Sequence, residues 1–337
     1  MTEPALKTLQ SKLCPWLRPA LDRLERAHAA QRLGHAWLIA GPPGVGKLNL
    51  ALVFARRLLE RRRAPDEPQD LSPPDAVAAM RERHAPVDHH PDLHWLFPEE
   101  GKTAVSVEQV REAAAALNLK AHAGGSKVVL LEQADGMTTA AANALLKTLE
   151  EPSADTYLLL LADQPNRLPA TIRSRCQRLL VPRPARALVA TWLGVAPEAF
   201  AAAWVLTGGS PLQMAALLDG NKINETSSLR NQVELISEDK VALQTVAESW
   251  SKSDPELALT WVTRELHHEI RARLGSTSVT DREPTALHNA WRDLTLRRLF
   301  DQYERADRLL GQLGSGINVE LGLQALLLGF QANRGST

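Results

Sequence analysis

In this 337-residue chain, a glycine-rich segment directly follows an apolar run and sets the strongest limit on the possible folds. The segment reads Gly41-Pro42-Pro43-Gly44-Val45-Gly46-Lys47 and has the spacing G-x-x-x-x-G-K. It lies between a predicted strand at residues 36–40 and a predicted helix at residues 47–63. Glycines let successive backbone N–H groups surround phosphate oxygens, and a lysine here reaches the outer phosphates. The segment predicts a P-loop, with Gly41, Gly44, Gly46 and Lys47 as candidate nucleotide-binding residues.

Up to residue 182, strand-like runs alternate with helix-like stretches. Strands are expected at residues 36–40, 93–97, 127–132, 157–162 and 177–181, and further helices at 106–118 and 138–150. Ser106 and Gln109 have the spacing of a capping box at the start of the first of these helices. This alternation is typical of a parallel sheet with helices on both faces.

Other stretches are less regular. Residues 64–91 are rich in proline and predict an insertion loop with one short helix near 75–83 and no part in the core. Beyond residue 182 the remaining sequence is helical, and the polar stretch 220–228 predicts a linker. The expected domains are therefore 1–182, 183–220 and 221–337. Apolar residues spaced along one helix face from Trp291 to Leu313 favour a bundle core over a partner surface.

Composition excludes some classes of function. Lys plus Arg and Asp plus Glu both number 39, so there is no net positive field to hold a phosphate backbone, and any nucleic-acid contact has to be local or shared. Cys14 and Cys176 are the only cysteines, and no secretory leader is evident at the amino terminus. No apolar run approaches the ~20 residues of a membrane helix. A cytoplasmic protein without a membrane span is expected.

Two positions that P-loop ATPases need for catalysis are altered. The residue after Lys47 is Leu48, whereas Ser or Thr is needed there to bind Mg²⁺. The strand at 127–132 ends in Glu132 and Gln133, where such ATPases carry an Asp for the metal and a Glu for the attacking water. Glu132 can still assist a cation, but the amide of Gln133 cannot accept a proton. Two alternatives stay open for the loop: a structural turn without ligand, or weak binding of ATP or ADP.

Several longer segments carry a resemblance to a known family. They are Gly34-His35-Ala36, the run Asn-Ala-Leu-Leu-Lys-Thr-Leu-Glu-Glu-Pro at residues 143–152, and Thr-Ile-Arg-Ser-Arg-Cys at residues 171–176. Together they resemble the clamp loader of bacterial DNA polymerase III, whose subunits are AAA+ proteins. The resemblance covers residues 12–220 well, and the last third mainly through its helical character and residues 317–321. It implies an α/β AAA+ P-loop domain, a small helical lid domain and an all-α carboxyl-terminal collar domain.

Within this family the sequence is similar to the delta-prime type, which lacks working catalysis. A motor subunit would carry a phosphate-sensing Thr where this chain has Ala162-Asp163-Gln164, and a sensing Arg where Gly209-Ser210 leads into Pro211. Many relatives hold a structural zinc with four cysteines in the insertion after the loop helix. This chain has only histidines there, His84, His89, His90 and His94, so no metal is expected.

The resemblance also gives Arg175 a role. In the family this arginine enters the nucleotide site of the neighbouring subunit, where its planar charge stabilises the transferring phosphoryl group. Arg173 could serve instead or as well. Cys176 is predicted to be a core residue, because a strand follows it and no Cys-His pair is implied.

The expected function follows from these features. The chain would be a subunit without ATPase activity that joins motor (gamma/tau) and delta subunits to load the sliding clamp onto primer-template DNA. It would belong to the DNA-directed DNA polymerase (nucleotidyltransferase) holoenzyme and need no cofactor. One alternative is an active, motor-type AAA+ ATPase that tolerates Leu48. A P-loop nucleotide kinase is a third reading, which the long helical last third disfavours.

Overall fold

The computed structural model describes residues 9–60, 67–81, 90–99, 102, 104–121, 125–220, 222–275, 287, 291–313 and 317–330. These residues form two compact units. The first contains the chain up to Gly194 together with Ser210–Ala215, and the second contains Val195–Gly209 and the chain from Ala216 onward. His84, His89 and residues 61–63 of the expected helix lie outside the described residues. The division into three domains stays a prediction.

The first unit is built on a parallel sheet of five strands in the order β4-β5-β6-β2-β7. The strands are β2 (Ala36–Ala40), β4 (Leu93–Leu96), β5 (Lys127–Leu131), β6 (Thr156–Ala162) and β7 (Gln177–Leu180). Each expected strand is present, and its ends agree within one residue. The predicted α/β class is therefore confirmed. Because β2 lies between β6 and β7, the loop that follows β2 is flanked by the ends of both strands.

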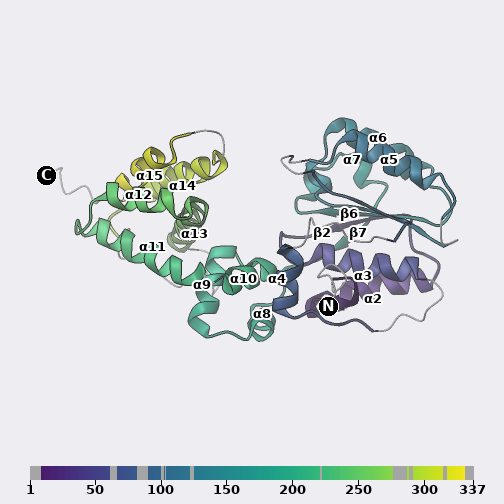
Figure 1. Ribbon diagram of the computed structural model, residues 1–337, viewed down its shortest axis with the longest axis horizontal. Helices are drawn as coiled ribbons and strands as arrows, with labels where there is room; N and C mark the ends of the chain where they lie inside the picture. Colours follow the sequence, from purple (N-terminus) through teal and green to yellow (C-terminus); the bar gives the residue numbers. More distant parts are fainter. Residues whose placement is uncertain are drawn as a thin grey trace. The chain divides into compact units, whose positions relative to one another are not determined.

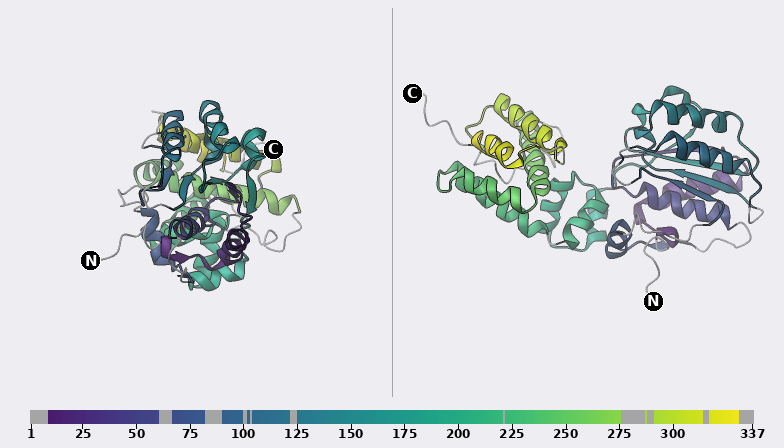
Figure 2. Two further views of the ribbon diagram at one scale, coloured as in Figure 1. Left: turned by 90° about the vertical axis from the view of Figure 1, so that its right-hand side faces the viewer. Right: turned by 45° about the horizontal axis from the view of Figure 1, so that its top comes forward.

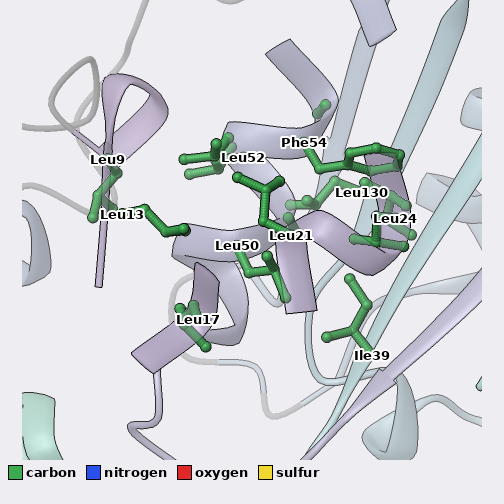
Figure 3. Packing of buried hydrophobic residues seen from close by; sticks show 14 of the residues in the cluster. Leu9, Leu13, Leu17, Leu21, Leu24, Ile39, Leu50, Leu52, Phe54 and Leu130 are labelled. Carbon is green, nitrogen blue, oxygen red and sulfur yellow. The ribbon is translucent and has the colours of Figure 1, made fainter. Parts of the chain in front are cut away.

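Helices cover both faces of this sheet (Figure 1). One face carries α2 (Arg18–Ala29) and α3 (Lys47–Leu59), and the other carries α5 (Val107–Leu117), α6 (Thr139–Glu150) and α7 (Ala170–Arg173). Successive strand residues point to opposite faces. Accordingly Ile39 and Leu130 pack against α2 and α3 (Figure 3), whereas Leu38 and Leu131 belong to the cluster beneath α5 and α6.

The capping box predicted for α5 is confirmed. The Ser106 hydroxyl accepts a hydrogen bond from the Gln109 amide at 3.2 Å, and the Gln109 side-chain oxygen accepts one from the Ser106 amide at 2.9 Å. The Gln109 side-chain nitrogen also donates to the carbonyl of Phe97 at 3.1 Å. The start of α5 is thereby tied to the segment that leaves β4.

The expectation that residues 64–91 have no part in the core is wrong for their described portion. Strands β1 (Lys12–Leu13) and β3 (Gln69–Asp70) form a small parallel pair, and α4 spans Pro73–Arg81. Leu71, Ala76 and Ala79 are buried in the same cluster as α2 and α3. The prolines at the start of α4 begin the helix instead of breaking it, because the first helical turn needs no N–H donors.

A further helix of the first unit, α8 (Arg186–Leu193), is anchored by a tryptophan. The Trp192 indole N–H donates to the carbonyl of Leu71 at 2.7 Å. Its ring also meets Trp16 edge to face, with ring centroids 5.0 Å apart. This segment of the small helical region therefore packs on the α/β unit.

Within the described residues of the second unit, all the regular secondary structure is helical (Figure 2). Its helices are α9 (Pro197–Thr207), α11 (Lys222–Ser237), α12 (Leu243–Lys252), α13 (Pro255–Arg273), α14 (Leu296–Gly311) and α15 (Val319–Leu328), and α10 (Pro211–Asp219) leads into them. Trp291, Leu299 and Ala306 are fully buried, which confirms the bundle core expected for this stretch. Within the described part of the chain, no helix combines the length and apolar character that a bilayer span requires.

The linker expected at residues 220–228 is wrong, because α11 begins at Lys222. Thr226, Leu229, Val233 and Ile236 are buried at helical spacing along it. The serines between them face solvent, so the polar composition of this stretch marks the outer face of an amphipathic helix.

Candidate functional site

The glycine loop joins the carboxyl end of β2 to the amino end of α3. Gly44 and Gly46 have φ values of +68° and +92°, in the left-handed region that favours glycine. A Cβ atom on Gly41 would lie 2.2 Å from the carbonyl oxygen of Val181, and one on Gly44 would lie 1.8 Å from the Ser210 hydroxyl oxygen. The packing of the chain around the loop therefore requires glycine at these positions.

The backbone of the loop is held from three sides. The Gly41 amide donates to the carbonyl of Ala162 at the end of β6, at 3.2 Å. The Gly44 carbonyl accepts from the amide of Leu212 at the start of α10, at 3.1 Å, and the Val45 carbonyl accepts from the Trp16 indole N–H at 2.8 Å. The loop is thus preformed by its neighbours.

The Lys47 ammonium is held by three oxygen atoms of the protein. It donates to the carbonyls of Gly41 at 2.7 Å and Pro42 at 2.8 Å, and it forms an ion pair with Asp163 Oδ1 at 2.5 Å. Its side chain is only 8% exposed. A lysine ammonium has three hydrogens to donate, and each has an acceptor here.

Asp163 lies in the turn that follows β6, next to the end of β2. The carboxylate of Asp135 accepts hydrogen bonds from the amides of Asp163, at 3.1 Å, and Gln164, at 2.6 Å. These two bonds fix the turn from which the Asp163 side chain reaches Lys47. The sequence predicts no contact between Asp163 and Lys47, because the missing Thr is the only unusual feature of this stretch when it is compared with a motor subunit. An acidic residue directly after a strand is the signal in the sequence that points to such a contact.

A cavity of about 320 Å³ opens beside the loop. It is lined by the loop, by the first turn of α3, by the residues after β5 and β6, and by an apolar wall. The lining residues are Leu9, Pro43, Gly44, Gly46, Lys47, Leu48, Asn49, Ala76, Ala79, Met80, Glu132, Gln133, Leu161, Asp163, Leu212 and Gln213. All four candidate residues lie in the loop, and Gly44, Gly46 and Lys47 line this cavity. Leu48 presents an apolar side chain at the position where Mg²⁺ needs a hydroxyl.

The two residues after β5 also line the cavity. Glu132 is only 2% exposed, and its carboxylate accepts a hydrogen bond from the Trp95 indole N–H at 2.8 Å. Gln133 has a left-handed backbone, with φ of 49°. Its amide occupies the position at which a carboxylate would take a proton from attacking water, so this position cannot supply a general base.

Asn49 closes the wall of the site on the side of the amino-terminal segment. Its side-chain oxygen accepts from the Cys14 amide at 2.9 Å, and its side-chain nitrogen donates to the carbonyls of Leu9 at 2.8 Å and Lys12 at 2.7 Å. Cys14 is fully buried, and burial raises the pKa of its thiol above the ordinary range. It is therefore a neutral packing residue beside Gly46.

Arg175 lies at the other end of the sheet from the glycine loop. It follows α7 and precedes the edge strand β7, which spans four residues, or about 13 Å at 3.3 Å per residue. Because β2 and β7 are parallel, the start of β7 lies at the amino ends of the strands, whereas the loop after β2 lies at their carboxyl ends. The guanidinium pairs with Glu150 at 2.6 Å and donates to the Thr171 carbonyl at 2.9 Å, with 35% of the side chain exposed.

The neighbours of Arg175 differ from it in exposure. Arg173 is half-buried. One of its terminal nitrogens donates to the Asn166 side chain at 3.4 Å, and its buried Nε has no hydrogen-bond partner among the residues that the structure describes. Cys176 is 8% exposed, which confirms its assignment to the core. Burial raises the pKa of its thiol to about 11, although nearby Arg178 acts in the opposite direction. Arg175 is therefore the more accessible of the two candidate arginines.

Two sequence comparisons with known proteins agree with each other. Residues 16–185 match the family model described as DNA polymerase III, delta subunit. The chain is 39% identical over 258 residues to DNA polymerase III subunit delta' of Pseudomonas aeruginosa, and the aligned segment covers 73% of this chain and 74% of that protein. It is 39% identical over 211 residues to the subunit of the same name from Escherichia coli, covering 61% of each chain. A solved structure of a DNA polymerase III, gamma subunit-related protein from Thermotoga maritima aligns with a TM-score of 0.48 at 18% identity, covering 94% of this chain and 98% of that one.

Proposed function

The chain belongs to the DNA polymerase III delta' family, and from this premise we propose that it is a clamp-loader subunit without ATP turnover of its own. It acts in the cytoplasm with motor (gamma/tau) and delta subunits, and it meets the sliding clamp and primer-template DNA as part of that complex. The balance of 39 basic and 39 acidic residues supports shared contacts with DNA over an independent grip on the phosphate backbone.

Two side chains that line the cavity support the proposed lack of ATP hydrolysis. Leu48 offers no atom to ligate Mg²⁺, and Gln133 offers no group to accept a proton from water. Because these defects affect separate steps, repairing one of them leaves the other in place. An active motor-type ATPase would need both functions from other residues.

The proposed contribution of the subunit to catalysis is Arg175, donated to the nucleotide site of its neighbour. Two observations support this proposal. Arg175 is partly exposed, and it lies at the amino ends of the strands, so it cannot reach the chain's own glycine loop at their carboxyl ends. The ion pair with Glu150 holds the guanidinium at the surface before assembly. Arginine supplied in this way typically raises the rate of phosphoryl transfer by about 10³ to 10⁵.

Turnover by the isolated chain tests the first part of the proposal. The purified protein with Mg–ATP is expected to show no steady hydrolysis above the rate of a Lys47→Ala variant. Hydrolysis at a motor-like rate that disappears in Lys47→Ala would refute the absence of turnover.

Reconstitution tests the second part. In a loader where only the motor site next to this subunit keeps its P-loop lysine, Arg175→Ala is expected to lower clamp- and DNA-stimulated ATP turnover by about 10³ or more. Arg178→Ala, which removes an exposed arginine from the adjacent edge strand, is the matched control and should retain turnover. Unchanged turnover with Arg175→Ala, or an equal loss with the control, would rule out the donated arginine.

A further inference from the structure

The ammonium of Lys47 is saturated by the protein itself. Two carbonyls of the glycine loop and the carboxylate of Asp163 accept its three hydrogens at 2.5 to 2.8 Å. In a P-loop that binds nucleotide, this ammonium reaches the outer phosphates. A phosphate could gain Lys47 only by displacing at least one of these acceptors.

The Asp163 carboxylate is the acceptor that most resembles a phosphate oxygen. It is anionic, it lies 2.5 Å from the Lys47 ammonium, and its turn is fixed by two hydrogen bonds, which the amides of Asp163 and Gln164 donate to the Asp135 carboxylate. Charge-assisted hydrogen bonds are roughly twice as strong as neutral ones. Because the carboxylate belongs to the same chain and its turn is already ordered, it competes with a free anion without the entropy loss of association.

The altered catalytic positions do not by themselves decide whether the loop binds a nucleotide. Leu48 and Gln133 remove metal binding and water activation, yet a glycine loop, a lysine and a helix N-terminus still attract a phosphate. Size does not exclude a ligand either, because a cavity of about 320 Å³ falls within the roughly 300 to 1,000 Å³ typical of small-molecule sites. A further feature has to determine what the loop accepts.

We propose that Asp163 is that determinant: its carboxylate takes the place of an outer phosphate on Lys47, and so excludes nucleoside polyphosphates from a loop whose frame is intact. The inference rests on the proposed function, since both concern the same loop. It names Asp163 as the residue that prevents nucleotide binding, so that nucleotide binding and ATP hydrolysis can be tested separately.

Equilibrium binding of ADP and of inorganic pyrophosphate, without Mg²⁺, tests the inference on the full chain. Asp163→Asn and Asp163→Ala are both measured, so that one variant remains if the other fails to fold, and circular dichroism checks each. Both variants are expected to bind these anions at least about tenfold more tightly than the parent chain. Adding Lys47→Ala to Asp163→Ala is expected to abolish the gain.

Glu112→Gln is the matched control, because it removes one negative charge from an exposed position on α5. It should leave binding as weak as in the parent chain. The inference is overturned if folded Asp163 variants gain no affinity, if Glu112→Gln gains as much, or if the gain persists without Lys47. Hydrolysis of Mg–ATP by the parent chain would instead refute the proposed function, and Asp163→Asn should bind ADP yet still show no turnover.

Discussion

Replacing Gly44 by alanine tests how closely the start of α10 is seated on the glycine loop. The new Cβ would lie 1.8 Å from the Ser210 hydroxyl oxygen and 3.2 Å from Ser210 Cβ, on a backbone with φ of +68°. A left-handed backbone costs a residue with a Cβ about 1–2 kcal/mol, and an overpacked contact costs about 1–3 kcal/mol. Gly44→Ala is therefore expected to lower the free energy of unfolding of the first unit by about 2–5 kcal/mol.

The second half of the experiment removes the obstructing hydroxyl. Ser210 is 2% exposed, and among the described residues its hydroxyl has no hydrogen-bond partner. Ser210→Ala alone should therefore not lower the stability, because a buried unpaired hydroxyl costs the folded state about 1–3 kcal/mol. In that background the closest contact of a Cβ added at Gly44 relaxes to 3.2 Å. Gly44→Ala should then cost only the backbone part, which gives a coupling energy of about 1–3 kcal/mol between the two sites.

Hydrogen exchange in β2 and β6 measures these effects, because central strands exchange through opening of the whole unit. Gly194→Ala is the matched control: Gly194 has φ of +62° in the same unit, and no atom of the described part of the chain lies within 4 Å of its added Cβ. It should cost only about 1–2 kcal/mol. The packing described for Gly44 is refuted if its replacement costs no more than that control, or costs the same with and without the Ser210 hydroxyl.

Three further predictions concern other parts of the chain. Arg273→Ala leaves the fully buried carboxylate of Glu269 without the guanidinium now 2.6 Å away; it should destabilise the second unit by about 3–5 kcal/mol in thermal unfolding, and an effect below about 1 kcal/mol would contradict the buried pair. Because burial raises the pKa of Cys176 to about 11, a thiol reagent at pH 8 should label it slowly in the native state and rapidly after denaturation; equal rates would contradict its burial. The hydrogen bond from Ser72 lowers the pKa of Asp75, so its stabilisation is complete above the ordinary carboxyl range and is lost as pH falls through the lowered pKa. The difference in melting temperature between the parent chain and Asp75→Asn should thus be largest near neutral pH and shrink in acid, and a constant difference would be inconsistent with that shift.

Local patterns in the sequence predict much of the first unit. The continuous apolar run at residues 128–131 matches a strand buried on both faces, and Ser106 with Gln109 marks the start of a helix because the two side chains satisfy each other's backbone amides. Composition misleads where it conflicts with the spacing of the apolar residues. Residues 220–228 are polar, yet Thr226 already lies on the buried face of α11, and Ala76 and Ala79 bring a proline-rich segment into the core.

The candidate site also contains a part that the sequence predicts and a part that only the fold reveals. The loop residues and Leu48 are adjacent in sequence, so their spacing alone predicts that they share one site. The pair between Lys47 and Asp163 spans 116 positions and depends on β6 lying beside β2, which no local pattern specifies. The same holds for Trp95 and Glu132, which meet only because β4 and β5 are neighbours.

The glycines of the loop have a consequence for how such motifs persist in evolution. Gly41 faces the Val181 carbonyl, Gly44 faces Ser210, and Gly46 has Leu17 and Cys14 within about 3 Å of any added Cβ. Mutations at these positions would be removed by selection for a folded protein, whether or not a ligand was ever bound. A protein lineage can therefore lose ATP hydrolysis and still keep the G-x-x-x-x-G-K motif. Genome surveys that count this motif consequently measure the inheritance of a fold and do not count active ATPases.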